Sequence, residues 1–222
     1  MRERESDLAG WDVELPDKFR REWLNLSKEM FDLENLKFNR SLVPKGYDKS
    51  TKATLVMFSD GSDKGQCVVA YLVWKKENNK ENLVSLVTSR TKIASMTKMT
   101  TPRSELNVAQ LQARLKTWLH NNLDLELGDT VHIVDASIIL GMIRNISLKF
   151  DTYTAPRVSE IQTSTEIEKW FWVDTKDNPS DLWDQGQGCY QGLGDGEYVE
   201  RRPCLAEVPQ RSVAIEVRLQ ET

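Results

Sequence analysis

The sequence predicts a mixed α/β domain, because segments with the patterns of strands and helices follow one another along its middle part. Three short segments rich in valine, tyrosine and other strand-forming residues come first. An amphipathic helix, a fourth strand, two helical stretches and a fifth strand follow, an order typical of one sheet with helices packed on it. The expected strands are 54–59, 67–75, 83–88, 130–134 and 170–173, and the expected helices are 101–121, 136–146 and 156–165.

The composition is that of a soluble globular protein. The chain has 222 residues, of which 39% are hydrophobic and 29% charged, so it can bury a sizeable core. No apolar run approaches the roughly 18 residues that span a bilayer, and the first residues lack the apolar segment of a signal peptide. We therefore expect an intracellular protein without a membrane partner.

Both ends of the chain differ from its middle. Between Asp17 and Leu36 apolar residues recur every three or four positions, which predicts a helix with one apolar face. We favour the interpretation that this helix packs on its own domain; the alternative is docking on a domain that precedes it in a longer polypeptide. Proline, glycine and polar residues around Pro44 predict a linker. In residues 208–219 apolar and polar residues alternate, which makes this segment a candidate for an added strand. The expected parts are an N-terminal helical extension (1–50), a central domain (51–184) and a C-terminal extension (185–222).

The residues available as metal ligands exclude several kinds of site. Cys67, Cys189 and Cys204 are widely spaced and odd in number, which argues against a disulfide framework and against a thiolate zinc site. His120 and His132 are the two histidines of the chain, too few for a histidine-rich cluster. Any metal must therefore be held by oxygen, which favours magnesium or manganese.

Four acidic residues stand where predicted elements end or begin. Two end the first and fourth strands, one lies in the first turns of the long helix, and one opens a helix after the fifth strand: Asp60, Asp135, Glu105 and Asp181. Each alone is also an ordinary terminus of an element. In open α/β sheets, however, such positions converge on one ligand site. Four carboxylates can hold two divalent ions about 3.5–4 Å apart, a spacing suited to in-line cleavage of a phosphodiester.

The charge of the chain is uneven. Its net charge of −4 is not typical of a protein that binds nucleic acid. Residues 82–104, however, contain no acidic side chain and four basic ones: Arg90, Lys92, Lys98 and Arg103. These residues form a candidate basic strip, with a solvated loop as the alternative.

Several spaced motifs resemble one known family. Phe58–Ser62 resembles the first-strand signature of ribonuclease H, and Thr101–Leu106 resembles the helix that carries the glutamate of that enzyme. The motif order is most similar to the ribonuclease H-like region of BEL/Pao retrotransposon polyproteins, whose later motifs resemble Arg157–Ile161 and Thr175–Asp181. The likeness runs over residues 11–181, most of the chain.

This resemblance implies a ribonuclease H-like fold, with a five-stranded mixed sheet of three antiparallel strands followed by two parallel ones. It implies that two Mg²⁺ or Mn²⁺ ions, without a small-molecule cofactor, act in cleavage of the RNA strand of RNA–DNA hybrids during reverse transcription. A reverse transcriptase domain of the same polyprotein is an expected partner, and the cytoplasm, virus-like particles or the nucleus are expected locations. The implied metal-binding and catalytic residues are Asp60, Glu105, Asp135 and Asp181.

A hybrid exposes 2′-hydroxyls in a shallow minor groove, so recognition should depend on hydroxyls and phosphates. Near the scissile strand we expect the Gly61 backbone, Ser62, Arg103 and Asn107; on phosphates we expect Arg90, Lys92 and Lys98. Trp170 and Trp172 could stack on bases, but we favour core positions for both. We also expect His132 to be an interior histidine with its hydrogen bonds satisfied.

The chain departs from the family in two places. The family commonly continues after its last aspartate with serine-arginine-glycine, whereas Leu182 follows here, and neither histidine lies near Asp181 as in cellular ribonucleases H. One alternative is therefore a domesticated or inactive module that binds nucleic acid or a protein without cleavage. Another is a different nuclease of the same superfold, such as an exonuclease or an integrase-like enzyme.

Overall fold

The computed structural model describes residues 14, 16–32, 39–47, 50–75, 82–94 and 99–180. The chain divides into two compact units, Met1–Arg40 and Ser41–Thr222. Within the part described, no helix is both long enough and apolar enough to cross a membrane.

The described residues of the first unit form helix α1 (Asp17–Asp32), where the apolar spacing predicts a helix. Trp23 follows Phe19 by four residues, and Met30 follows Trp23 by seven, which is about two helical turns. The three side chains therefore share one face of α1. The interpretation that this helix packs on its own domain stays a prediction.

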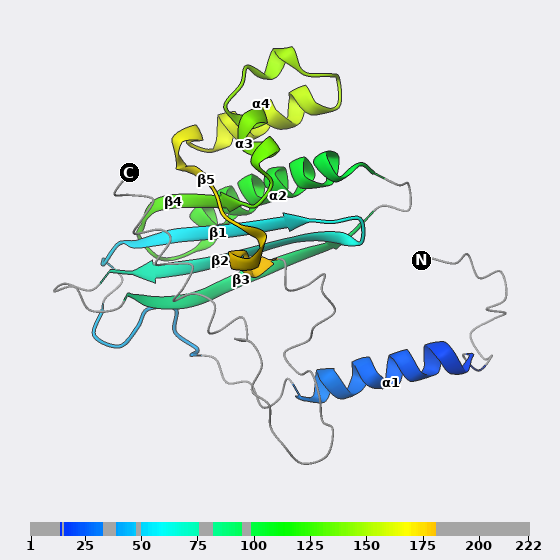
Figure 1. The fold of residues 1–222 in the computed structure, drawn as a ribbon. Helices are drawn as coiled ribbons and strands as arrows, with labels where there is room; N and C mark the ends of the chain where they lie inside the picture. The colour runs from blue at the N-terminus through cyan, green and yellow to red at the C-terminus, as the bar shows by residue number, and fades with distance from the viewer. Residues whose placement is uncertain are drawn as a thin grey trace. The chain divides into compact units, whose positions relative to one another are not determined.

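The second unit is built on one five-stranded sheet (Figure 1). Its strands lie in the order β3-β2-β1-β4-β5. β2 runs antiparallel to both β1 and β3, whereas β4 runs parallel to β1 and β5. The predicted sheet, three antiparallel strands followed by two parallel ones, is thereby confirmed. The strands are β1 (Ala53–Gly61), β2 (Gly65–Trp74), β3 (Leu83–Ile93), β4 (Leu127–Val134) and β5 (Trp170–Trp172).

Helices cover one face of this sheet (Figure 1). The long helix packs on β1 and β2, and the two shorter helices pack on the long helix and on each other. Leu55, Val68 and Leu115 belong to the apolar cluster between the long helix and the sheet. The helices are α2 (Thr101–Asn122), α3 (Ser137–Ile143) and α4 (Thr154–Ser164).

The other face of the sheet is apolar as well. Val56, Phe58 and Tyr71 belong to a second buried cluster, on the side of β1 and β2 that points away from α2. Successive side chains of a strand point to opposite faces, so β1 and β2 are buried on both sides along their whole length. This explains why their sequences read as continuous apolar runs rather than as an alternation.

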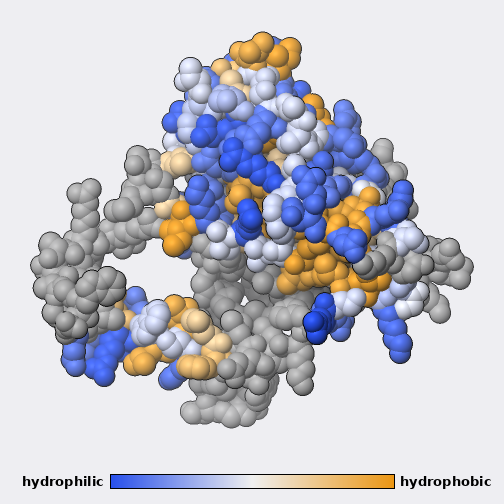
Figure 2. Space-filling view, turned by 180° about the vertical axis from the view of Figure 1, so that it is seen from behind, coloured by the Kyte–Doolittle hydropathy of each residue, from blue (hydrophilic) through white to orange (hydrophobic). Residues whose placement is uncertain are grey.

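The connection between α3 and α4 exposes apolar side chains. Ile146 and Leu148 are 61% and 88% exposed, and Figure 2 shows an apolar cluster at the tip of the molecule where this connection lies. Exposed apolar residues are common on protein surfaces. We infer no site from them.

Residues 41–47 pack on the sheet, although the sequence predicts a linker there. Leu42 contacts the core between α2 and the sheet, and Ser85 Oγ donates a hydrogen bond to the Leu42 carbonyl at 2.9 Å. The ring of Tyr47 meets that of Trp74 edge to face, with centroids 5.7 Å apart. The proline and glycine of this segment therefore shape a packed turn.

Helix α2 begins at Thr101, as the sequence predicts. Thr100 rather than Thr101 is the N-cap, which makes Pro102 the second residue of the helix. The backbone N–H groups of the first turn have no partner within a helix, so proline is tolerated at either position. The helix predicted to open at Asp181 and the candidate strand within 208–219 lie outside the described residues.

Gly61, the last residue of β1, allows the strand to approach the first turn of α2 closely. A Cβ atom at Gly61 would lie 2.9 Å from the carbonyl oxygen of Ser104 and 3.1 Å from the Cα of Glu105. The same junction is closed by Ser104 Oγ, which donates to the Ser62 carbonyl at 2.9 Å, and by Gln66 Nε2, which donates to the Ser104 carbonyl at 3.4 Å. The end of β1 and the start of α2 are thus fixed to each other.

A chain of buried hydrogen bonds lies beneath this end of β1. Gln112 of α2 donates to the Met57 carbonyl at 2.8 Å and accepts from Ser59 Oγ at 2.7 Å. Asn178 Nδ2 donates to the Ser59 carbonyl at 3.1 Å, and Asn178 Oδ1 accepts from Ser180 Oγ at 2.5 Å. A buried polar group that loses its partner costs free energy, so these bonds hold β1, α2 and the segment after β5 in one arrangement.

His132 is buried, as expected, but its hydrogen bonds are not all satisfied. Its ring stacks on that of Trp170 with centroids 4.4 Å apart, and its Nδ1 has no hydrogen-bond partner. Burial lowers the pKa of His132 to about 3, with smaller contributions from Lys116 and His120. The folded protein therefore keeps this imidazole neutral.

Gly61→Ala should lower the free energy of unfolding by about 1–3 kcal/mol, because the added methyl group must displace the backbone of α2. Gly141, exposed in α3, provides the control, since a Cβ atom there meets nothing within 4 Å. Gly141→Ala should raise stability by about 0.5–1 kcal/mol through helix propensity. Urea unfolding measures both variants, and equal effects would contradict the close approach at Gly61.

Acid should destabilise the protein through His132. The ordinary pKa is 6.5 and the folded pKa about 3, so below pH 6.5 the unfolded chain binds a proton that the folded chain does not. Stability should then fall by about 1.4 kcal/mol per pH unit from this group. His132→Phe keeps the ring stack and should weaken this dependence between about pH 5 and 7 in denaturant titrations. His120, whose pKa burial also lowers, remains in the variant, so some slope should persist. An unchanged slope would contradict the assignment to His132.

Candidate metal centre and the pocket around it

The parallel pairing of β1 and β4 places two carboxylates side by side. Ser59 and Val134 are partners in the register of the two strands. The residues that follow them, Asp60 within β1 and Asp135 directly after β4, therefore lie at the same level. The carboxyl ends of parallel strands are where α/β sheets gather ligand-binding side chains.

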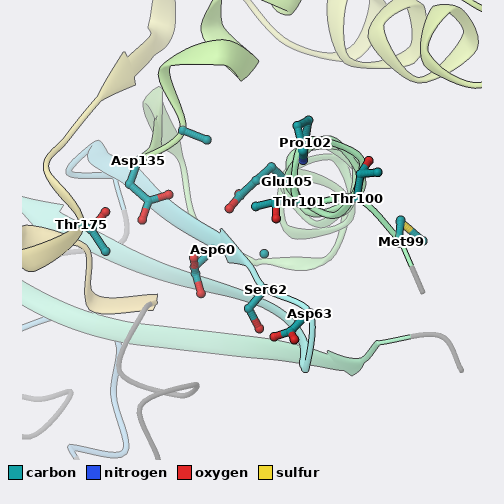
Figure 3. A pocket seen from close by; sticks show the side chains of 12 residues that line it. Asp60, Ser62, Asp63, Met99, Thr100, Thr101, Pro102, Glu105, Asp135 and Thr175 are labelled. Atoms are coloured by element: carbon teal, nitrogen blue, oxygen red, sulfur yellow. The ribbon is translucent and has the colours of Figure 1, made fainter. Parts of the chain in front are cut away.

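Helix α2 supplies a third carboxylate. Glu105 is the fifth residue of α2 and follows Ser104, which is hydrogen-bonded to the turn between β1 and β2. The close approach of the two elements at Gly61 brings Glu105 toward Asp60. Figure 3 shows the three carboxylates pointing toward one another from β1, α2 and the end of β4.

One oxygen atom from each of Asp60, Glu105 and Asp135 lies within 4.8 Å of the other two. Asp60 and Glu105 are 6% and 9% exposed, and Asp135 is half-buried. At about 5 Å and an effective dielectric constant near 20, each ionised pair repels by roughly 3 kcal/mol. A divalent cation among them would attract all three and remove this penalty.

The carboxylates line a pocket of about 950 Å³. This volume is at the upper end for small-molecule sites and leaves room for more than an ion. Hydroxyl groups stand around the acids, on the β1–β2 turn, at the start of α2 and after β5 (Figure 3). The other lining residues are Gly61, Ser62, Asp63, Met99, Thr100, Thr101, Pro102, Ala136 and Thr175.

The donor set fits a hard divalent cation. Magnesium and manganese take oxygen ligands and usually keep water or phosphate in part of their coordination sphere, which an open pocket with three carboxylates permits. Cys67, the β2 partner of Asp60, is not a competing ligand. Burial, with a contribution from the Asp60 charge, raises its pKa to about 12, so it remains a protonated thiol.

Asp181, the predicted fourth carboxylate, lies outside the described residues. The described chain ends one residue earlier, at Ser180, which is hydrogen-bonded to Asn178. Asn178 is in turn bound to the carbonyl of Ser59, the residue before Asp60.

The predicted phosphate contacts on β3 lie outside the pocket. Arg90 is the register partner of Val68, which faces α2, and the Arg90 guanidinium lies 5.8 Å from the centre of the Trp118 ring. Lys92 is the partner of Gln66, which also reaches toward α2. Both basic residues thus follow the edge of the sheet on the α2 side. Gly61 and Ser62 line the pocket, and Lys98 lies outside the described residues.

Arg103 and Asn107 belong to a cluster between α2 and α4, together with Tyr153 and Arg157, which are not among the predicted site residues. Asn107 Oδ1 accepts hydrogen bonds from Tyr153 Oη at 2.9 Å and from Arg157 Nε at 2.8 Å. The guanidinium groups of Arg157 and Arg103 lie 3.7 and 4.5 Å from the centre of the Tyr153 ring. The sequence signal for this cluster is Arg157, the first residue of one of the motifs that resemble the family.

The two tryptophans of β5 differ. Trp170 is fully buried, which confirms its predicted core position, whereas Trp172 is 48% exposed and that prediction is wrong. Both side chains point to the same face of β5, but Trp172 is the last residue of the strand and lies outside the apolar cluster in which residues of α3 and α4 cover Trp170. Trp172 Nε1 donates to the Asp135 carbonyl at 2.7 Å and so holds the chain at a metal-site residue.

Solved structures similar to this chain include ribonucleases H. RNase H1 from the archaeon Halobacterium salinarum is 11% identical, with a TM-score of 0.33, and the match covers 60% of this chain and 98% of that one. The N-terminal RNase H domain of a Mycobacterium tuberculosis protein is 8% identical, with a TM-score of 0.37 and coverages of 57% and 86%. LC11-RNase H1, solved in complex with an RNA/DNA hybrid, is 9% identical, with a TM-score of 0.32 and coverages of 58% and 89%. Residue roles do not carry over at such identities.

No curated protein matches the chain. The model of the family described as the Pao retrotransposon-like RNaseH-like domain matches residues 1–136, more than half of the chain. The matched part includes Asp60, Glu105 and Asp135. The resemblance found in the sequence motifs is thereby confirmed, and the chain belongs to the family of Pao retrotransposon-like RNaseH-like domains.

Proposed function

We propose that this chain is a metal-dependent endonuclease that cleaves the RNA strand of RNA–DNA hybrids during retrotransposon reverse transcription. The observation that carries the proposal is the convergence of Asp60, Glu105 and Asp135 in one pocket, with room for part of a nucleotide beside them. Membership of the Pao retrotransposon-like family supports it. The proposed partner is the reverse transcriptase domain of the same polyprotein.

Asp60, Glu105 and Asp135 would hold the Mg²⁺ or Mn²⁺ ions, with Asp181 as the proposed fourth ligand. When bound, two such ions activate a water molecule and stabilise the departing oxygen during in-line displacement at phosphorus. The chain itself contributes the spacing of the carboxylates. Two parallel strand ends and one helical turn fix that spacing before any ligand binds, so little reorganisation remains for the reaction.

The rim of the pocket favours recognition of a sugar over recognition of a base. Ser62, Thr100 and Thr101 offer hydroxyl groups, which both donate and accept hydrogen bonds. A helix containing RNA presents 2′-hydroxyls in a wide, shallow minor groove, where such groups can pair with them. This supports a hybrid as substrate rather than a DNA duplex.

Phosphate contacts would come from the basic edge of β3. Arg90 and Lys92 project on the side of the sheet that carries the start of α2. Local fields rather than the net charge govern the approach of a polyanion, so a chain with a net charge of −4 can still bind through such an edge. We propose that Lys98 extends it.

Asp60→Asn and Asp135→Asn should each reduce cleavage of a labelled RNA–DNA hybrid by roughly 100-fold or more, because each removes a charged oxygen ligand. Circular dichroism and the melting temperature should show intact folding. Asp129→Asn is the control, since Asp129 is an exposed partner of Lys169 away from the pocket. It should cleave like the parent protein.

Parallel assays with hybrid, duplex RNA and duplex DNA separate the alternatives. Magnesium-dependent cleavage retained in both pocket variants would overturn the proposal. Binding of the hybrid without turnover in either metal would favour a module that binds without cutting. Preference for duplex DNA would favour another nuclease of the same superfold.

Divalent cations should stabilise the folded protein, because they relieve the repulsion among the three carboxylates. At a cation concentration 100 times the dissociation constant, the gain should be about 2.7 kcal/mol. Thermal unfolding with increasing Mn²⁺ or Mg²⁺ measures it, and Asp60→Asn should lose most of the shift. An equal shift in parent and variant would place the binding elsewhere.

A further inference from the structure

We propose that Tyr153, Arg103 and Arg157 form a binding surface, here called the Tyr153 platform, for a backbone phosphate of the nucleic acid that enters the carboxylate pocket. The inference rests on the proposed function and adds a contact outside the pocket. It assigns a role to the junction between α2 and α4, which the nuclease proposal leaves without one.

The first observation is the crowding of two like charges at one ring. The guanidinium groups of Arg157 and Arg103 lie 3.7 and 4.5 Å from the centre of the Tyr153 ring. The two cations are therefore close to each other as well as to the ring. The ring attracts both cations, but they repel each other. A phosphate beside them would satisfy both, and guanidinium groups are the side chains best suited to phosphate oxygens.

The second observation is that Arg157 is already oriented. Its Nε donates to Asn107 Oδ1 at 2.8 Å and its Nη1 donates to the Tyr153 carbonyl at 2.6 Å. Tyr153 Oη donates to the same Asn107 oxygen at 2.9 Å. The two bonds of Arg157 use two of the five N–H groups of its guanidinium. A side chain that is held in place before binding loses less entropy when it binds. Asn107 thus acts as a support for the platform rather than as the direct substrate contact expected from the sequence.

The third observation is continuity with the pocket. Met99 lines the pocket, and its Sδ lies 3.1 Å from Asn107 Nδ2 and 3.4 Å from Tyr153 Oη. Arg103 stands in the first turn of α2, next to Pro102, which also lines the pocket. A nucleic-acid strand that extends from the carboxylate pocket toward α4 therefore passes the Tyr153 platform.

Among the described residues, Asp151 pairs with Arg103 of the platform, while Glu160, which pairs with Arg114, also interacts with the charge of Arg157. Asp151 Oδ2 lies 3.3 Å from Arg103 Nη2, with both side chains about half exposed at 56% and 48%. Exposed pairs of this kind are weak in water, so a phosphate can displace the carboxylate. Asp151 Oδ1 meanwhile accepts from the backbone N–H of Thr154 at 2.7 Å at the start of α4. An asparagine could keep that cap while removing the competing charge.

The test measures hybrid binding without metal, in an Asp60→Asn background, by fluorescence anisotropy of a labelled RNA–DNA hybrid over a range of salt concentrations. Arg157→Ala and Arg103→Ala should each weaken binding about 3- to 10-fold and lower the slope of log K against log salt by about one. Asp151→Asn should tighten binding about 2- to 5-fold. Lys149→Ala, which removes one exposed charge in the α3–α4 connection, should leave binding unchanged.

In the active protein, Arg103→Ala should raise KM for the hybrid with little change in kcat, which loss of fold would not produce. Arg103 is exposed, so this variant remains informative even if Arg157→Ala unfolds. Parent-like binding and salt slope in the folded variants would overturn the platform and leave the nuclease proposal standing. If the parent protein cleaves no substrate but these variants still lose hybrid binding, the platform is supported and the nuclease proposal is overturned.

Discussion

The electrostatic repulsion among three carboxylates is the constraint on which the rest of this structure depends. One oxygen atom from each of Asp60, Glu105 and Asp135 lies within 4.8 Å of the other two, and two of these residues are buried, so their ionised forms repel one another and a divalent cation would relieve that repulsion. The parallel register of β1 and β4 and the missing side chain of Gly61 hold them there. Stability from the apolar core is thus spent on keeping a site that is unfavourable by itself, as at many functional sites.

Ser59 links the elements that carry this site. Its side chain binds Gln112 of α2, and its carbonyl accepts from Asn178 after β5. A glutamine in the middle of an apolar interface has no value for hydrophobic burial, but its two bonds to β1 fix the position of α2 along the strand. A fully satisfied buried network specifies one arrangement where apolar packing alone would tolerate sliding. The spacing of the carboxylates follows from that arrangement.

The sequence predicts the order of the helices and strands and the positions of Asp60, Glu105 and Asp135 at their ends. It can do so because hydrophobic periodicity, turn residues and position within an element are local properties of the chain. It was insufficient where the outcome depends on contacts between distant segments. Tyr153 and Arg157 meet Asn107 across the packing of α2 on α4, and no periodicity encodes that pairing. Trp172 resembles Trp170 in sequence, but its exposure depends on its position at the end of β5, outside the cluster that buries Trp170. The same holds for the unpaired nitrogen of His132, whose surroundings come from three elements.

The net negative charge of the chain becomes consistent with a nucleic-acid substrate once the charges are placed in space. The acids of the site face a pocket where metal ions can neutralise them, so they need not repel phosphate in the loaded protein. Arg90 and Lys92 line the β3 side of α2, and the Tyr153 platform lies on its α4 side. Positive charge therefore flanks α2 on two sides, with Lys92 opposite Gln66 near the start of the helix and Arg90 beside Trp118 near its end. On the proposed function, such a pattern would attract a polyanion at its flanks and admit it to the centre only with cations, so that metal binding and substrate binding would depend on each other.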